Sequence, residues 1–221
     1  MSRLYAFTKR SETTRRAEAL YNLAFVPAMR RDNDETRRRV ETSLALARKV
    51  GRPDIAAQSQ AHLGTRAAVA GDPRSALRLL EEATAFFRQD GDRLHLADAL
   101  VSIAIAHRLL AQPQLARRAY MEALGLSTES RNMPGIGSGL LVGAAVESAG
   151  GQHLAAVRMM AAAVALSETF GASSPEMPAL RNEVEEAARQ ALGSVAVEHA
   201  LALGRRLTPD EVVEYAASIG T

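Results

Sequence analysis

The apolar and polar residues between positions 54 and 92 form two amphipathic runs of helical spacing, separated by a Gly-Asp-Pro break at 71–73. A glycine just past the end of one helix and a proline at the start of the next are typical of helix termini. Small residues occupy facing positions of the two runs, at Gly64 and Ala76, and a large residue follows at Leu80. The pattern therefore predicts two antiparallel helices that pack closely.

The same spacing of small and large residues recurs every 40 residues along the chain. The corresponding residues are Ala24, Thr36, Val40 and Ser43 in the first copy, Gly64, Ala76, Leu80 and Ala83 in the second, Ala104, Ala116, Tyr120 and Ala123 in the third, and Ala144, Ala156, Met160 and Ala163 in the fourth. A fixed period of this size is typical of helical repeats, whose units stack because none can bury its apolar face alone. We therefore expect an all-α solenoid of four helix pairs.

Turn residues and the loss of the period divide the chain into units. The predicted units are an N-terminal extension (1–12), four repeats (13–52, 53–92, 93–133 and 134–177) and a C-terminal helical cap (178–221). The first repeat is expected to hold helices near 13–30 and 34–50. The cap is expected to hold three helices, the last of which starts with a capping sequence at 208–211. An atypical end unit with a polar outer face is usual for a solenoid.

The spacing resembles the tetratricopeptide repeat, whose usual period is about 34 residues. The longer unit of 40 residues resembles the C-terminal region of LuxR-type and AfsR-type bacterial regulators and of related cyclase-linked ATPases. Residues 71–92 carry the Gly-Asp…Gly-Asp pattern of that region, and RQALG (189–193) and LGRRLTPDEVVEY (203–215) resemble its end. The likeness covers residues 13–218. It implies a non-catalytic protein- or peptide-binding scaffold, the regulatory module of a transcription or signalling regulator in the bacterial cytoplasm.

In arrays of this kind the first helix of each pair lines a concave face, so the resemblance also implies a partner-binding groove. By register, its predicted residues are Tyr21, Phe25, Met29, Thr65, Val69, Val101, Ile105, Arg108, Leu109 and Leu141. This surface is mostly apolar and has an aromatic end, which suits an amphipathic helix of a partner protein. Two alternatives stay open, because the chain's own first residues or a second copy of the chain would also cover these side chains.

Aromatic residues gather near the N-terminus. Four of the nine, Tyr5, Phe7, Tyr21 and Phe25, fall within the first 25 positions. A solenoid exposes apolar surface wherever a unit has no neighbour. We therefore predict a contact site at this end, which joins two copies in a homodimer about a two-fold axis or docks a preceding domain in a longer protein.

The charge of the chain is uneven, although its net value is only +2. Residues 1–52 hold 13 Lys/Arg against 6 Asp/Glu, a net of +7, so the remainder carries −5. The densest basic patch consists of Arg30, Arg31, Arg37, Arg38 and Arg39. It raises the alternative of a helical repeat that binds nucleic acid. Acidic residues at helical spacing interrupt the patch, which favours a solvated and largely neutralised helix face instead.

The sequence offers little chemistry for catalysis or for a bound cofactor. Cysteine is absent, and the five histidines show no metal-ligand spacing. The glycines of 135–143 lack the preceding strand of a dinucleotide-binding loop, and no phosphate-binding GxxxxGK[ST] motif is present. No segment reads as a membrane span or a secretory leader. We therefore expect a soluble intracellular protein that is not an enzyme and that holds no cofactor or metal.

Overall fold

The computed structural model describes residues 2–24, 33–170 and 177–219, and the side chains among them except those of residues 2–10 and Met177. This part of the chain folds into eleven helices and contains no strand. The helices are α1 (Ser2–Leu23), α3 (Asn33–Val50), α4 (Pro53–Val69), α5 (Pro73–Asp90), α6 (Arg93–Leu109), α7 (Pro113–Glu129), α8 (Met133–Ala149), α9 (His153–Phe170), α10 (Met177–Leu192), α11 (Ser194–Gly204) and α12 (Pro209–Ser218).

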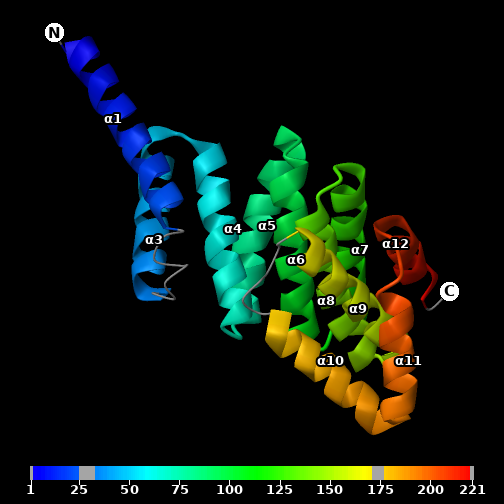
Figure 1. Cartoon of the computed structure of the whole chain (residues 1–221). Helices are drawn as coiled ribbons and strands as arrows, with labels where there is room; N and C mark the ends of the chain where they lie inside the picture. Colours follow the sequence, from blue (N-terminus) through cyan, green and yellow to red (C-terminus); the bar gives the residue numbers. More distant parts are fainter. Residues whose placement is uncertain (1, 25–32, 171–176, 220–221) are drawn as a thin grey trace.

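Successive helices stack in chain order into an elongated array. Figure 1 shows α3 to α9 side by side, α1 projecting from one end and α10 to α12 gathered at the other. The pairs are α1/α3, α4/α5, α6/α7 and α8/α9, and each pair packs on the next. The predicted all-α solenoid of four helix pairs with a C-terminal helical cap is confirmed.

The first helix differs from the prediction at both ends. Helix α1 begins at Ser2, so the boundary predicted between residues 12 and 13 falls inside one continuous helix. Residues 2–23 contain neither proline nor glycine, and nothing in this stretch interrupts helical hydrogen bonding. The helix ends at Leu23, earlier than the predicted residue 30. Residues 25–32 lie outside the described part of the chain.

The 40-residue period is present in the backbone as well as in the side chains. Gly71, Ala111 and Gly151 close the turn inside the second, third and fourth pairs, and all three have positive φ angles, of 80°, 54° and 82°. The amide of the next residue donates to a carbonyl five positions back, as Asp72 does to Ala67 at 2.9 Å. This is the usual way to satisfy the last carbonyls of a helix.

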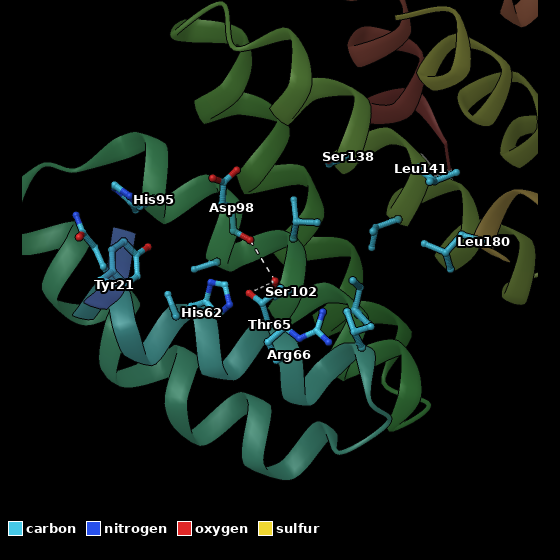
Figure 2. Close-up of a pocket in the computed structure, with 17 residues that line it drawn as sticks. Tyr21, His62, Thr65, Arg66, His95, Asp98, Ser102, Ser138, Leu141 and Leu180 are labelled. Carbon is cyan, nitrogen blue, oxygen red and sulfur yellow. Dashed lines mark hydrogen bonds between the residues drawn. The ribbon is translucent and has the colours of Figure 1, made fainter. Parts of the chain in front are cut away.

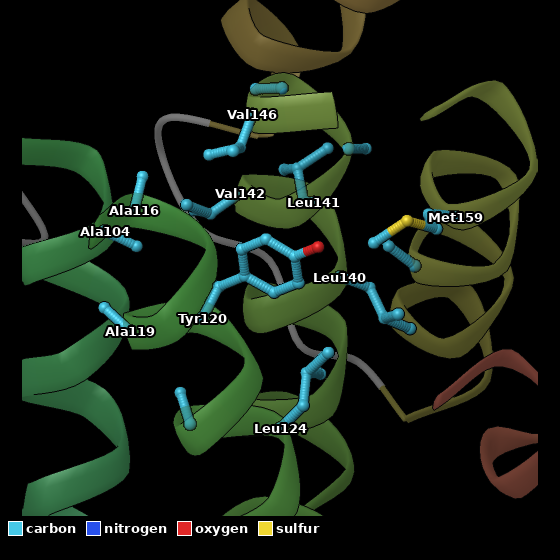
Figure 3. Packing of buried hydrophobic residues seen from close by; sticks show 14 of the residues in the cluster. Ala104, Ala116, Ala119, Tyr120, Leu124, Leu140, Leu141, Val142, Val146 and Met159 are labelled. Atoms are coloured by element: carbon cyan, nitrogen blue, oxygen red, sulfur yellow. The ribbon is translucent and has the colours of Figure 1, made fainter. Parts of the chain in front are cut away.

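The predicted register of large and small residues is confirmed by burial. Val40, Leu80, Tyr120 and Met160 are each 0 % exposed. In Figure 3, Tyr120 lies between the alanines of α6 and α7 on one side and Val142, Leu140 and Met159 on the other. The main hydrophobic core runs from Ala57 to Ile219, and a smaller cluster around Ala17, Ala47, Ile55 and Ala56 holds the first pair. One register therefore positions every layer of the array.

The glycines of α8 serve helix packing. A Cβ atom on Gly143 would lie 2.8 Å from Met159 Cε and 2.9 Å from Tyr120 Cε2. A Cβ atom on Gly139 would lie 2.8 Å from Leu124 Cδ2. Both contacts are closer than ordinary carbon–carbon separations, so these positions allow the neighbouring helices to approach. The glycine-rich sequence therefore belongs to a helix and not to a phosphate-binding loop.

A buried polar cluster ties the cap to the array. Arg117 of α7 donates hydrogen bonds to the carboxylate of Glu147 on α8 and to the backbone carbonyls of Ala216 and Ile219 at the end of α12. The Tyr120 hydroxyl donates to the same carboxylate, and burial, followed by this contact, raises the pKa of Tyr120 well above its ordinary range. Because Glu147 is buried, the guanidinium that neutralises it also fixes the position of α12.

An ion pair also repeats with the period, along the second helices of neighbouring pairs. Arg48 of α3 lies 3.5 Å from Glu82 of α5, and Arg88 of α5 lies 2.9 Å from Glu122 of α7. The next residues in register are Thr128 and Ala162. Ala162 is buried in the main core. The series of surface pairs thus stops at the last repeat, which the cap covers.

None of the described helices combines the length and the apolar character that a membrane span requires.

Candidate functional site

A cavity of about 370 Å³ opens on the face formed by the first helices of the pairs. Helices α4 and α6 supply most of its lining, α8 adds three residues, α1 closes one end with Tyr21 and α10 closes the other with Leu180. Figure 2 shows Tyr21, His95 and Asp98 at one end and Leu141 and Leu180 at the other. The size lies within the usual range for ligand pockets, about 300–1,000 Å³.

Six of the ten predicted groove residues line this cavity. They are Tyr21, Thr65, Val69, Val101, Ile105 and Leu141. Phe25 and Met29 lie outside the described residues. The structure therefore brings together groove positions from α1, α4, α6 and α8, as the 40-residue register requires.

Arg108 and Leu109 are not part of the cavity lining. Arg108 donates a hydrogen bond of 2.7 Å to Glu183 of α10, and Leu109 remains exposed at the end of α6. Helix α10 packs against α8 and α9 and closes the groove at this level. The predicted groove therefore extends one turn too far along α6. The repeat spacing alone does not show where α10 of the cap crosses the array.

The groove is also more polar than predicted, since His62, Arg66 and His95 line it as well. The prediction followed one narrow stripe on each helix. On α4, steps of four residues from Gln58 reach His62 and Arg66, which lie on the same face. A wider stripe, read with steps of three and four together, would have included them.

Acidic and aromatic groups form one end of the groove. The Asp92 carboxylate caps α6 by accepting from the His95 amide at 3.1 Å, and it also lies 2.6 Å from His95 Nδ1. Asp98 is open to solvent at the cavity mouth, although protein atoms surround much of its side chain. This desolvation raises the pKa of Asp98, the neighbouring His95 ring partly offsets the rise, and Asp92 adds to it. Burial, together with the charges of Asp98 and Asp92, raises the pKa of Tyr21 to about 12.

Hydroxyl groups and a histidine form the middle of the groove. Thr65 of α4 and Ser102 of α6 are joined by a hydrogen bond of 2.8 Å between their hydroxyls. His62 meets the Tyr21 ring edge to face, with ring centroids 6.5 Å apart. Burial, followed by the charge of Arg66, lowers the pKa of His62, which favours a neutral ring. The hydrogen bond between Thr65 and Ser102 links α4 to α6 along the middle of the cavity.

The far end of the groove is apolar. Val101 and Ile105 of α6, Leu141 and Val142 of α8 and Leu180 of α10 line it. Leu141 and Val142 belong to the buried core, so this end is backed by tightly packed side chains. Such a surface suits the large apolar side chain of a ligand.

The basic patch is partly neutralised where the structure describes it, because two carboxylates face three guanidinium groups. Arg37 pairs with Glu41 at 2.8 Å, and Arg38 and Arg39 pair with Glu35 at 2.9 and 2.7 Å. These two arginines hold the pKa of Glu35 below its ordinary value. Arg30 and Arg31 lie outside the described residues. The arrangement is a solvated helix face with internal ion pairs. This is the interpretation that the acidic residues at helical spacing favoured in the sequence.

The N-terminal contact surface stays a prediction. Phe25 and the side chains of Tyr5 and Phe7 lie outside the described residues. Tyr21 packs against His62 and lines the groove. Among the described residues, no group of three or more His, Cys, Asp or Glu side chains is placed to hold a metal ion.

Comparison with known families agrees with the geometry of the first two helix pairs. Residues 15–89 match the tetratricopeptide repeat. The match extends from α1 to the end of α5, and proteins with this repeat are generally protein-interaction scaffolds. The third and fourth pairs repeat the same register in three dimensions. Neither the curated proteins nor the solved structures gave a match to the chain.

Proposed function

We propose that this chain is a non-catalytic scaffold that binds a peptide segment of another protein in the groove between α4, α6 and α8. The cavity lined by α4, α6 and α8 carries the proposal, since it combines an apolar end with a few polar groups that would orient a ligand. The match of residues 15–89 to a repeat of interaction scaffolds supports it. The chain acts by binding alone, and it forms no covalent bond with its partner.

The resemblance of residues 71–92 and of the cap sequence supports a more specific setting. In that setting the chain is the regulatory module of a bacterial transcription or signalling regulator in the cytoplasm. Occupancy of the groove then biases the state of the attached domain, to the extent that the ligand binds one state more tightly than the other. This step rests on the resemblance of the sequence, since fold alone does not specify function.

A matched pair of variants tests the proposal. Val69 lines the cavity and is 38 % exposed, whereas Leu115 of α7 is 42 % exposed and lies outside the cavity. Val69→Glu places a charge in the groove and Leu115→Glu places one elsewhere, with similar effects on folding. We expect affinity capture from the native host to recover the same partner with the wild type and with Leu115→Glu, and to lose it with Val69→Glu. A partner retained by Val69→Glu binds elsewhere and contradicts the groove.

The nucleic-acid alternative has a separate test. Glu41 and Glu35 offset two of the three positive charges of Arg37, Arg38 and Arg39 on α3. We therefore expect no measurable binding of DNA or RNA by fluorescence anisotropy at low salt. Binding that weakens steeply as salt is added would instead support phosphate contacts by this helix.

A further inference from the structure

The groove has a charged end and an apolar end on the same face of one helix. Asp98, Val101, Ser102 and Ile105 all line the cavity from α6. Residues three, four and seven positions apart share one face of an α-helix. Asp98 and Ile105 are seven residues apart, which corresponds to about 10 Å along the helix axis. A ligand that follows α6 therefore meets a carboxylate first and an apolar surface about 10 Å later.

Among the residues whose side chains the structure describes, no arginine or lysine forms an ion pair with the Asp98 carboxylate, which lines the cavity. The neighbouring Asp92 carboxylate already caps α6 and contacts His95, so the acidic end carries more negative charge than its single histidine can balance. Desolvation raises the pKa of Asp98, which means that its ionised form is costly in the free protein. A ligand cation at this place would remove that cost.

The positive charge of the groove lies away from Asp98. Arg66 stands next to Thr65 on α4, and Thr65 hydrogen-bonds to Ser102, one turn beyond Asp98 on α6. Arg66 also donates a hydrogen bond to Asn33 at the start of α3. A ligand cation is thus attracted to the Asp98 end and repelled from the middle of the groove. The charges therefore give a bound peptide a direction.

We infer that the groove takes a basic–apolar peptide, with a lysine or arginine at Asp98 and a large apolar side chain against Ile105 and Leu141. This inference rests on the proposed function and adds the chemistry of the ligand. Charge complementarity selects the cation, and the apolar end selects the second side chain. The spacing of about 10 Å corresponds to three residues of an extended peptide or seven residues of a helical one.

A displayed library of random 12-residue peptides, selected on the full chain, tests the inference. We expect the enriched peptides to share a lysine or arginine with an apolar residue three or seven positions away. Enriched peptides without a preference for a basic residue, or with an acidic one in its place, overturn the inference. Val69→Glu serves as the counter-selection. Peptides that also bind this variant attach outside the groove and are discarded, and peptides that bind only the wild type are kept.

A double-mutant cycle then assigns the basic residue to Asp98. The basic residue of one selected peptide is replaced by glutamine, and each peptide is titrated against the wild type and against Asp98→Asn. We expect the replacement to weaken binding to the wild type by about tenfold, the usual effect of losing a charge-assisted hydrogen bond. The same replacement should leave binding to Asp98→Asn unchanged. An equal loss with both proteins places the cation elsewhere and overturns the inference.

Failure of this inference differs from failure of the proposed function. If peptides without a basic residue bind in the groove, the result agrees with the scaffold function and contradicts only the proposed contact with Asp98. A library that yields no peptide sensitive to Val69→Glu contradicts both. Light scattering tests whether a second copy of the chain occupies the groove, because it measures the oligomeric state. If the wild type forms a dimer that Val69→Glu dissociates, a second copy fills the groove, and the basic–apolar peptide is ruled out.

Discussion

Gly64 on α4 faces Leu80 on α5 so closely that a Cβ atom at Gly64 would lie 2.6 Å from Leu80 Cγ. Leu80 is fully buried, so its side chain has little room to move aside. The absence of a side chain at residue 64 therefore sets the distance between the two helices of this pair. The sequence position of this glycine carries structural information that a count of apolar residues would miss.

Gly64→Ala is expected to destabilise the protein by about 1–3 kcal/mol, because overpacking outweighs the better helix propensity of alanine. Gly125 on α7 provides the control, since a Cβ atom there would meet nothing within 4 Å. Gly125→Ala should stabilise the protein by up to about 1 kcal/mol. Urea denaturation measures both. Equal effects of the two substitutions would contradict close packing at residue 64.

Ala104→Leu should also overpack a layer, at a cost of about 1–3 kcal/mol. Ala104 is fully buried in the third repeat at the position that corresponds to Gly64. Ala191→Leu, at an exposed position of α10, introduces the same side chain without a neighbour to displace and should have little effect. Thermal melting compares the two variants. An unchanged melting temperature for Ala104→Leu would show that this interface adapts more freely than its burial indicates.

The turn at Ala111 predicts a stabilising substitution. Ala111 has a φ angle of 54°, where the corresponding residues of the neighbouring repeats are Gly71 and Gly151. A Cβ atom in the left-handed region costs about 1–2 kcal/mol, so Ala111→Gly should recover about 1 kcal/mol. The reverse change, Gly71→Ala, meets no other atom and should lose a similar amount. Differential scanning calorimetry of the two variants should show melting temperatures that move in opposite directions.

Arg117→Ala is expected to free the last helix. The substitution leaves the buried Glu147 carboxylate without its cation and removes the donors to Ala216 and Ile219. We expect a loss of about 3 kcal/mol and faster amide exchange in α12 than in the four repeats. Tyr120→Phe removes one hydroxyl donor from the same carboxylate and should cost only about 1 kcal/mol. Uniform exchange across the chain in Arg117→Ala would contradict a local role.

Asp98 should lower the stability of the free protein at neutral pH. Its pKa is raised in the folded state, so the ionised form is disfavoured by folding. This cost is fully present above the folded pKa, shrinks as the pH falls through that value and vanishes below the pKa of the unfolded chain. Asp98→Asn should therefore melt at a higher temperature than the wild type at pH 7, and the difference should shrink at pH 3. Asp90→Asn, on the outer surface, is the control.

Much of this fold follows from the sequence because one spacing is repeated in every layer. Small and large residues 40 positions apart must occupy equivalent places, so the burial of Val40 predicts that of Tyr120. The extent of α1 did not follow in the same way. Its first half precedes the repeat, and the periodic pattern contains no signal for a helix there.

The groove was predictable only in part, for a related reason. The register identified residues that face it, including Thr65 and Ile105. It could not show that α10 crosses the array and engages Arg108, because Glu183 lies 75 residues away and outside the period. The raised pKa of Asp98 could not be predicted from the sequence either, because it depends on which side chains surround the carboxylate in the fold.

Arg48 pairs with Glu82 as Arg88 pairs with Glu122, so two successive junctions between layers share one ion pair. A duplicated copy of residues 53–92, inserted after Asp92, would present its own Glu82 to the original Arg88 and its own Arg88 to Glu122. A chain lengthened by a whole layer in this way would keep the Arg–Glu pairing at both new junctions. Such an insertion would add one more helix to the groove while leaving the capped end unchanged.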